Sequence, residues 1–351
     1  MSKIPVAVLA ATGSVGQRFV QLLDNHPWFE VVALTGSERG HGKTYGEVCR
    51  WLLPEPMPDW ARMMPVLPSE AESLNGARLA FSALPADIAR QVEPALAQAG
   101  IGVCSNASAY RREPDVPLLI PEVNPEHARL VEVQRRRRGW TGWITTNPNC
   151  TSTGMTIALK ALQDAFGLKR VFAVSLQALS GAGYPGVASL DIADNVIPFI
   201  SGEEDKVEWE PRKMLGKLEG EEIRLAEFGI SAHTNRVAVT DGHLVCLSVE
   251  LAERAAPEQA AAVLAEYESP APVADLPSVA RPVIVVRSEE NRPQPRLDRM
   301  TGRGMTTVVG RVRPDALFDL RLTVLSHNTI RGAAGGSLLN AELMVRLGYV
   351  S

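Results

Sequence analysis

The sequence predicts an α/β protein whose N-terminal third forms a doubly wound parallel sheet. Apolar, β-branched runs alternate there with segments of helical periodicity, a pattern typical of such sheets. A glycine-containing turn joins the first run to the first helical segment. The length of 351 residues suits two domains, and an apolar fraction of 45% is enough for a core in each.

The first strand and the first helix frame this turn. Residues 5–9 suit a buried parallel strand, and residues 17–23 have helical periodicity. Glycines between them would let the backbone approach a pyrophosphate and let the helix pack on the strand, and a helix start favours an anion. We therefore expect a phosphate-binding loop of Thr12, Gly13, Ser14, Val15 and Gly16. Because Ala10 replaces the first glycine of the usual fingerprint, a plain strand–helix turn is the alternative.

The second strand, residues 30–34, ends beside residues that can distinguish between dinucleotides. NAD-selective sites usually place an acid at this strand end for the ribose 2′-hydroxyl. Here Ser37 and Arg39 flank that position, and a hydroxyl and a guanidinium suit a 2′-phosphate. The segment therefore favours NADP, provided that the side chain of Glu38 points away.

Later segments continue the alternation. Residues 79–84 and 102–105 are strand-like, with an amphipathic helix expected over residues 87–98. Ser82 lies where a strand closes at the carboxyl edge, the edge at which doubly wound sheets bind ligands, so we include it among the cofactor contacts. Towards the C-terminus, residues 237–242 suggest a strand and turn, residues 320–325 a strand, and residues 331–347 a helix.

Cys150 is the candidate nucleophile among four cysteines that form no CxxC pair and no zinc-type cluster. It lies between a strand-like run, residues 143–146, and a helical segment, residues 155–166. Free N–H groups at a helix start would lower the pKa of its thiol and could hold an oxyanion. The alternative is a buried, inert cysteine, which is the commoner fate of free cysteines.

Composition excludes several classes of function. A net charge of -4 gives no reason to expect a nucleic-acid partner, and the basic run of residues 135–138 is best explained as a solvated helix end. No apolar run approaches the length of a membrane span, and no signal peptide is evident. We expect a cytoplasmic protein with no metal, no membrane and no nucleic acid as a partner.

Six segments together resemble the aspartate-β-semialdehyde dehydrogenase family, in its archaeal and fungal branch. They follow the family order over nearly the whole chain: NPNCTSTG around Cys150, QALSGAGYPGV (177–187), NVIPFISGEEDK (195–206), HTNRVAVTDGH (233–243), RPQPRLDR (292–299) and HNTIRGAAGGSLLNAEL (327–343). The resemblance implies that Cys150 is the nucleophile, that His243 is the acid and base, and that Gln177 orients the substrate.

The resemblance also implies binding roles. Arg236 would bind the substrate carboxylate, and Glu203 would bind its ammonium group. Lys206 and Arg111 would bind phosphate, although Arg112 lies beside Arg111 and sequence does not separate the two. The alternative for Glu203 and Lys206 is a surface ion pair on one helix face, without a role in binding. A further residue, Asn328, would contact the nicotinamide amide.

The implied activity is NADPH-dependent reductive dephosphorylation of L-aspartyl 4-phosphate to L-aspartate 4-semialdehyde, through a cysteine thioacyl intermediate. This step belongs to lysine, threonine and methionine biosynthesis. The implied assembly is a homodimer or homotetramer. Its NADP-binding domain would comprise residues 1–148 and 329–351, and residues 149–328 would form an α+β catalytic and dimerisation domain with a mixed sheet.

Two alternatives remain at this point. A malonyl-CoA reductase, or another acyl-CoA or acyl-phosphate reductase of the same fold, would use the same cysteine and histidine. A catalytically silent NADP-binding regulatory module would have lost part of the set, whereas this chain has all of its members.

Overall fold

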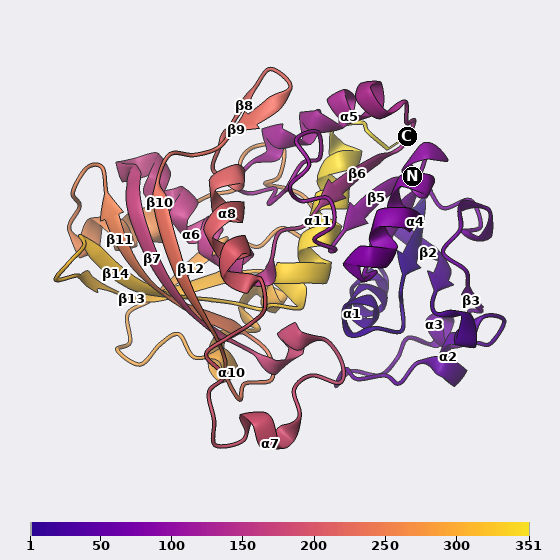
Figure 1. Cartoon of the computed structure of the whole chain (residues 1–351), viewed down its shortest axis with the longest axis horizontal. Helices are drawn as coiled ribbons and strands as arrows, with labels where there is room; N and C mark the ends of the chain where they lie inside the picture. Colours follow the sequence, from indigo (N-terminus) through magenta and orange to yellow (C-terminus); the bar gives the residue numbers. More distant parts are fainter. Residues whose placement is uncertain (1, 351) are drawn as a thin grey trace.

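The protein has two halves, each built on its own six-stranded sheet (Figure 1). The structure is a computed structural model that describes residues 2–350. One sheet is parallel and the other is mixed, so the expected fold class is confirmed. The two halves meet along α6, α8 and α11 in the middle of the molecule (Figure 1).

The first sheet is parallel throughout, with the strand order β3-β2-β1-β4-β5-β6. Its central strands are apolar on both faces because helices cover both sides. The strands are β1 (Ile4–Leu9), β2 (Phe29–Thr35), β3 (Val66–Leu67), β4 (Leu79–Ser82), β5 (Gly102–Ser105) and β6 (Trp143–Thr146). The order reverses direction between β1 and β4, and this is the switch point at which such sheets bind ligands.

Helices of the first half come from both ends of the chain. They are α1 (Ser14–Leu23), α2 (Tyr45–Val48), α3 (Asp59–Met63), α4 (Ala86–Gln98), α5 (Leu130–Arg138) and α11 (Gly335–Arg346). The last of these packs on α1, β4 and β5, so the end of the chain returns to the first sheet. It is buried almost all round, which explains its apolar and small residues.

The second sheet is mixed, with the order β10-β7-β11-β14-β13-β12. Its strands are β7 (Leu168–Gln177), β10 (Gly229–Arg236), β11 (His243–Leu251), β12 (Ile284–Arg287), β13 (Thr307–Pro314) and β14 (Leu320–Ser326). The pairs β10–β7 and β12–β13 are parallel, and the others are antiparallel. A separate hairpin, β8 (Lys217–Glu219) with β9 (Glu222–Arg224), projects from this half (Figure 1).

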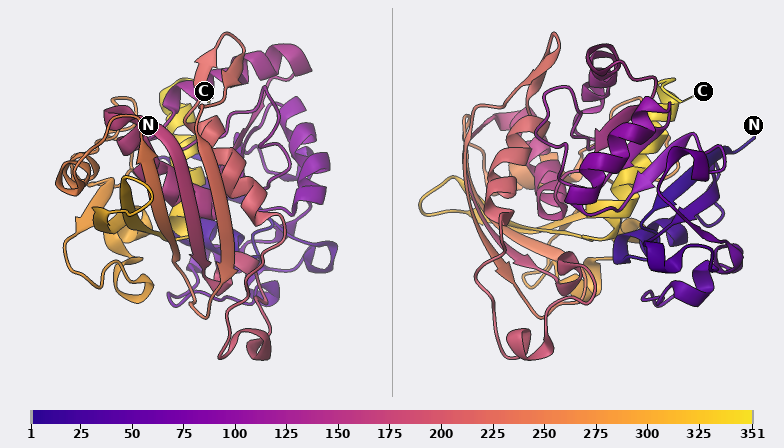
Figure 2. Two further views of the ribbon diagram at one scale, coloured as in Figure 1. Left: turned by 60° about the vertical axis from the view of Figure 1, so that its left-hand side comes forward. Right: turned by 45° about the vertical axis from the view of Figure 1, so that its right-hand side comes forward.

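Three helices lie on one face of the second sheet: α6 (Cys150–Phe166), α8 (Glu203–Met214) and α9 (Pro257–Ala265). Figure 2 shows the sheet with these helices behind it. Side chains of the opposite face include the exposed His233 and Cys246. Two short helices, α7 (Ser189–Ile192) and α10 (Pro295–Asp298), lie in the loops at the lower edge (Figure 1).

Two local expectations are wrong. Residues 237–242 form an irregular connection instead of a strand and turn, because the chain must cross the end of β7 to pass from β10 to β11. The C-terminal helix does not begin directly at residue 331 as an α-helix. It opens as a π-helical turn, Ile330–Ala334, in which Gly332 packs so closely on Cys150 that a Cβ would come within 2.8 Å of the Cys150 Cα.

The basic run is a salt-bridged helix end. Arg138 closes α5 and pairs with Asp115 and Glu113, and Arg136 and Arg137 both reach Glu221. No helix within residues 2–350 is both long and apolar enough to cross a bilayer.

Candidate active site

A cavity of about 880 Å³ gathers most of the expected site residues from both halves. The first half contributes the turn before α1 and the segment after β5, and the second half contributes the starts of α6 and α8 and the ends of β7 and β10. Eleven of the expected residues line it: Thr12, Gly13, Ser14, Val15, Arg111, Cys150, Gln177, Glu203, Lys206, Arg236 and Asn328.

The start of α1 offers free backbone donors to this cavity. Its cap residue, Gly13, has no side chain, and the first turn contains no acidic residue. The first N–H groups of any helix lack partners inside the helix, so these donors are available to an anion. Gly16 has a packing role instead, because a Cβ there would lie 2.3 Å from the Ala10 carbonyl oxygen.

A smaller cavity of about 130 Å³ adjoins the same turn through Thr12. Ser37 and Arg39 line it together with Gly36 and Gly40. A hydroxyl and a guanidinium beside a small cavity suit a phosphate group. Ser82 lies apart from both cavities, since it is fully buried under the sheet edge.

The centre of the site is the contact between Cys150 and His243. Cys150 is the first residue of α6, and His243 is the first residue of β11. The Cys150 Sγ lies 3.1 Å from the His243 Nε2, within range of a hydrogen bond to sulfur. Topology brings them together, because β11 pairs with β14 and α6 packs on both strands.

The backbone of Ala178 orients the groups around this contact. Its N–H donates to the His243 Nδ1 over 3.0 Å, and its carbonyl oxygen accepts from the Arg236 Nη1 over 2.7 Å. An imidazole that accepts at Nδ1 carries its neutral-form proton on Nε2. His243 therefore points an Nε2–H at the sulfur, which suits donating a hydrogen bond to a thiolate or to an oxyanion.

Burial dominates the titration of both groups. It raises the pKa of the Cys150 thiol to about 12; Glu203 raises this pKa further, whereas Arg111 and Arg236 lower it. Burial also lowers the pKa of His243 to about 3, with Arg236 acting in the same direction. Both shifts favour neutral forms. The lowered thiol pKa expected from the sequence is therefore wrong.

The physical reason is that burial and the Glu203 charge outweigh the groups that favour the thiolate, and the start of α6 is capped as well. The Asn149 side-chain oxygen accepts from the N–H groups of Thr151 (2.9 Å) and Ser152 (3.3 Å). These are the amides that were expected to hold an anion, and the cap already occupies them. The Thr151 N–H still lowers the pKa of the thiol, but burial and Glu203 act more strongly in the opposite direction.

Charged side chains surround the sulfur. Arg236 ends β10 beside Gln177, and it is largely buried. Glu203 and Lys206 form the ion pair that their spacing suggested, at 3.3 Å, and both line the cavity. Arg111 lines the cavity as well. Arg112 turns away, since it pairs with the exposed Asp205 and stacks over Trp209.

Asn328 holds two loops beside the cavity. Its side-chain oxygen accepts from the Gly242 N–H, and its amide donates to the Ser180 hydroxyl. The adjoining glycine loop is tight, because a Cβ on Gly181 would come within 2.8 Å of the Arg236 guanidinium. Among residues 2–350 no group of three His, Cys, Asp or Glu side chains could hold a metal ion.

Sequence reasoning missed three contributors: Asn149 as the cap, Glu210 and Lys213. Glu210 is buried and bonds both Arg111 and the Asn149 N–H. Lys213 is buried and donates to three backbone carbonyls of residues 111–116. A signal existed, because Glu203, Lys206, Glu210 and Lys213 repeat at helical spacing and so share one helix face.

Comparisons with known proteins show which family the chain resembles. A family model described as "Semialdehyde dehydrogenase, NAD binding domain" matches residues 5–131, and one described as "Semialdehyde dehydrogenase, dimerisation domain" matches residues 159–331. The chain is 54% identical to an aspartate-semialdehyde dehydrogenase of Archaeoglobus fulgidus, over 97% of this chain and 98% of the relative. It is 44% identical to that of Schizosaccharomyces pombe, over 98% and 99%.

A solved structure is similar over the whole chain. The crystal structure of aspartate semialdehyde dehydrogenase with NADP from Candida albicans superposes with a TM-score of 0.91 at 41% identity. The match covers 99% of this chain and 100% of that one.

Proposed function

The chain belongs to the aspartate-semialdehyde dehydrogenase family, and from this premise we propose that it reduces L-aspartyl 4-phosphate to L-aspartate 4-semialdehyde with NADPH. One observation supports the chemistry most directly. The Cys150 sulfur lies 3.1 Å from the His243 Nε2, at a cavity that also holds the cationic groups an acyl phosphate needs.

In our proposal the Cys150 thiol releases its proton to solvent, and the thiolate, stabilised by Arg111 and Arg236, attacks the acyl carbon of aspartyl phosphate. The bond from that carbon to the phosphate oxygen breaks, inorganic phosphate leaves, and a thioester remains on the sulfur. Arg111 and Lys206 would bind the departing phosphate, and Arg236 would bind the substrate carboxylate. Glu203 would bind the ammonium group of the substrate. The positive charge of that group would offset the negative charge of Glu203, which otherwise raises the pKa of the Cys150 thiol.

His243 acts on the second half of the reaction. NADPH, when bound, supplies the hydride that reduces the thioester. The Nε2–H of His243 would donate a hydrogen bond to the hemithioacetal oxygen and stabilise its negative charge, and collapse of this oxyanion would break the carbon–sulfur bond and release the aldehyde and the thiolate. Gln177 lies at the end of β7 in the same cavity, where it would orient the carbonyl group.

The residues present fit a dinucleotide. The uncapped start of α1 supplies backbone donors for a pyrophosphate, and Thr12, Gly13, Ser14 and Val15 line the cavity there. Ser37 and Arg39 would hold the 2′-phosphate of NADP in the adjoining small cavity. Asn328 would contact the nicotinamide amide, and Gly16 would support the turn. Ser82 would act through the strand edge, since it does not reach the cavity.

We also propose an oligomeric state and a division of the chain into two domains. The chain would act as a homodimer or homotetramer in the cytoplasm, consistent with the dimerisation-domain match. The cofactor domain would comprise residues 1–148 and 329–351, and the catalytic and dimerisation domain residues 149–328. The packing of α11 on the first sheet and the position of α6 against the second sheet support this division.

A malonyl-CoA reductase would use the same thiol and histidine but release CoA. The ion pair of Glu203 and Lys206 at the cavity favours an amino-acid phosphate. The test is phosphate-dependent reduction of NADP with aspartate semialdehyde, compared with NADPH oxidation on malonyl-CoA. We expect the first activity to exceed the second by orders of magnitude. Cys150→Ala should abolish it, and near-normal turnover in that variant would refute the mechanism.

A further inference from the structure

One face of α8 lies against two parts of the site: residues 106–116, which include Arg111, and Asn149, which precedes Cys150. Glu203, Lys206, Glu210 and Lys213 follow each other at spacings of three and four residues, which places them on one side of the helix. The first two line the cavity. The other two lie deeper, with exposed fractions of 2% for Glu210 and 3% for Lys213.

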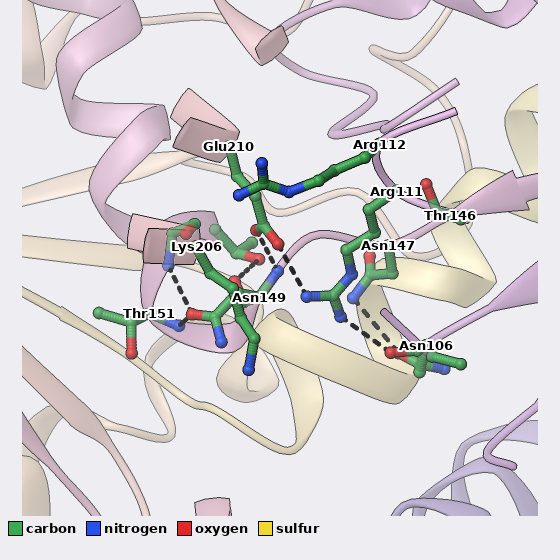
Figure 3. Close-up of polar contacts among 12 residues, drawn as sticks. Asn106, Arg111, Arg112, Thr146, Asn147, Asn149, Thr151, Lys206 and Glu210 are labelled. Atoms are coloured by element: carbon green, nitrogen blue, oxygen red, sulfur yellow. Dashed lines mark hydrogen bonds and ion pairs between the residues drawn. The ribbon is translucent and has the colours of Figure 1, made fainter. Parts of the chain in front are cut away.

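Glu210 makes two strong hydrogen bonds with its two carboxylate oxygens. Its Oε1 accepts from the Arg111 Nη1 over 2.8 Å, and its Oε2 accepts from the Asn149 N–H over 2.6 Å. Figure 3 shows the carboxylate between these two partners. Both bonds are short because the acceptor is charged, and both are shielded from water.

Arg111 depends on this carboxylate for its position. Its Nη2 donates to the Asn106 carbonyl oxygen, so its guanidinium is held at two corners. The Lys213 Nζ donates to the backbone carbonyls of Arg111, Glu113 and Val116, which ties the adjacent chain to the same helix. The Arg111 Nε is buried and has no partner within residues 2–350, so the guanidinium keeps donor capacity.

The second partner leads directly to the nucleophile. Asn149 precedes Cys150 in the chain, and its N–H is fixed by Glu210 while its side chain caps α6 and donates to Glu203. The main chain that enters the catalytic residue is therefore anchored by the same carboxylate that holds the guanidinium.

We propose that Glu210 is a positioning residue that sets the Arg111 guanidinium and the Cys150 thiol relative to each other through one carboxylate. The inference rests on the proposed function, because it assigns the phosphate group to Arg111. Its consequence is that the leaving phosphate and the attacking sulfur share an anchor, and small displacements between reacting groups can cost large factors in rate.

The test is steady-state kinetics of Glu210→Gln in the phosphate-consuming direction. A glutamine has one acceptor oxygen and one NH2 group, so it cannot accept from both Arg111 and the Asn149 N–H. We expect the KM for phosphate to rise about tenfold and kcat to fall about tenfold, with the KM for NADP unchanged. Glu210→Asp keeps the buried charge and both oxygens, retracted by one methylene, so a folded variant with a smaller effect is expected.

A double-variant cycle separates positioning from general structural damage. In an Arg111→Ala background, Glu210→Gln should add less than about twofold to the KM for phosphate, while its effect on kcat through Asn149 persists. A purely structural role would raise the KM for phosphate by the same factor in both backgrounds.

Glu208→Gln is the matched control, because Glu208 lies on the same helix and accepts from the Ala232 N–H of β10, away from the cavity. It should behave like the wild type. Wild-type phosphate kinetics in Glu210→Gln, or equal effects in both variants, would overturn the inference. A wild-type enzyme without phosphate-dependent activity would instead refute the proposed function.

Discussion

Two helix starts face the same cavity, and they are built differently. At the start of α1 the cap position is Gly13, no side chain caps the helix, and Gly13, Ser14 and Val15 line the cavity. At the start of α6 the side chain of Asn149 accepts from two of the first amides, and Cys150, the proposed nucleophile, stands in the first helical position. We call the uncapped start of α1 the open start, because its amides can bind an anion, and the start of α6, which Asn149 caps, the closed start.

The difference shows that a helix start beside the chemistry is not an anion site in itself. The open start can donate hydrogen bonds to a ligand, whereas the closed start uses its donors to hold its own first turn in place. The cap holds the first turn that carries Cys150, and the largest contributions that lower the thiol pKa come from the side chains of Arg111 and Arg236, ahead of the Thr151 N–H.

The largest expected effect concerns the pH dependence of Cys150 alkylation. Because burial raises the pKa of this thiol to about 12, the thiolate fraction should rise tenfold per pH unit through the neutral range. The rate of iodoacetamide labelling, followed by peptide mass spectrometry, should therefore rise about 100-fold from pH 7 to pH 9. A rate that levels off below pH 8 would show that the closed start of α6 lowers the pKa after all.

Glycine substitutions test the open start of α1. In Gly16→Ala the new Cβ would meet backbone atoms of Ala10 and Ala11 at 2.3 to 2.7 Å, so the helix must move and the free energy of unfolding should fall by roughly 2 kcal/mol. In Gly13→Ala the nearest atom lies at 3.4 Å, and φ is -75°, so stability should be nearly unchanged.

The same pair of variants separates packing from binding. Gly13→Ala should still raise the KM for NADP several-fold, because its methyl group would stand near the uncapped amides of α1. This factor corresponds to a loss of roughly 1 kcal/mol in the binding free energy. Urea denaturation measures the free energy of unfolding, and steady-state kinetics measure the KM for NADP. Equal stabilities for the two variants would contradict the packing role of Gly16.

Removing the cap should make the closed start more like the open one. Asn149→Ala should lower the free energy of unfolding by about 1 kcal/mol and should free the amides of Thr151 and Ser152. Freed amides can donate to the sulfur, so we expect iodoacetamide labelling at pH 7 to become about threefold faster. Asn149→Ser keeps a cap oxygen and should label at the wild-type rate; equal rates in the two variants would refute this account of the cap.

The smallest expected effect lies at Ala10, just before the open start. Its φ is +54°, a left-handed conformation that costs a residue with a Cβ about 1–2 kcal/mol. Ala10→Gly removes this strain but gains freedom in the unfolded chain, so a net stabilisation of up to about 1 kcal/mol is expected by urea denaturation. Destabilisation in this variant would show that the methyl group packs favourably.

The open start was predictable from the sequence because its signal is local. A strand, a turn that ends at Gly13 and a helix that contains Gly16 follow one another within about twenty residues, and this pattern can be read without the rest of the fold. Even the departure at Ala10 pointed to a position whose backbone suits glycine. The parallel first sheet follows from the same kind of local pattern, repeated.

The closed start was only half predictable. Sequence placed Cys150 at the beginning of a helix, but the direction of its pKa shift depends on burial and on charges from α8, β10 and the segment after β5. Glu210 illustrates the limit: helical spacing places it on the face of Glu203 and Lys206, but nothing local shows that Arg111 and Asn149 lie opposite. Long-range contacts of this kind are set by topology.

The central claim is that Cys150 carries the acyl group, and a trapped intermediate tests it most directly. The protein is incubated with aspartate semialdehyde and NADP without phosphate, quenched in acid and analysed by peptide mass spectrometry. We predict an aspartyl thioester on the peptide that contains Cys150, which disappears when phosphate is added before quenching. Absence of an adduct in a preparation that turns over once phosphate is supplied, or an adduct on Cys49, Cys104 or Cys246 instead, would contradict the account.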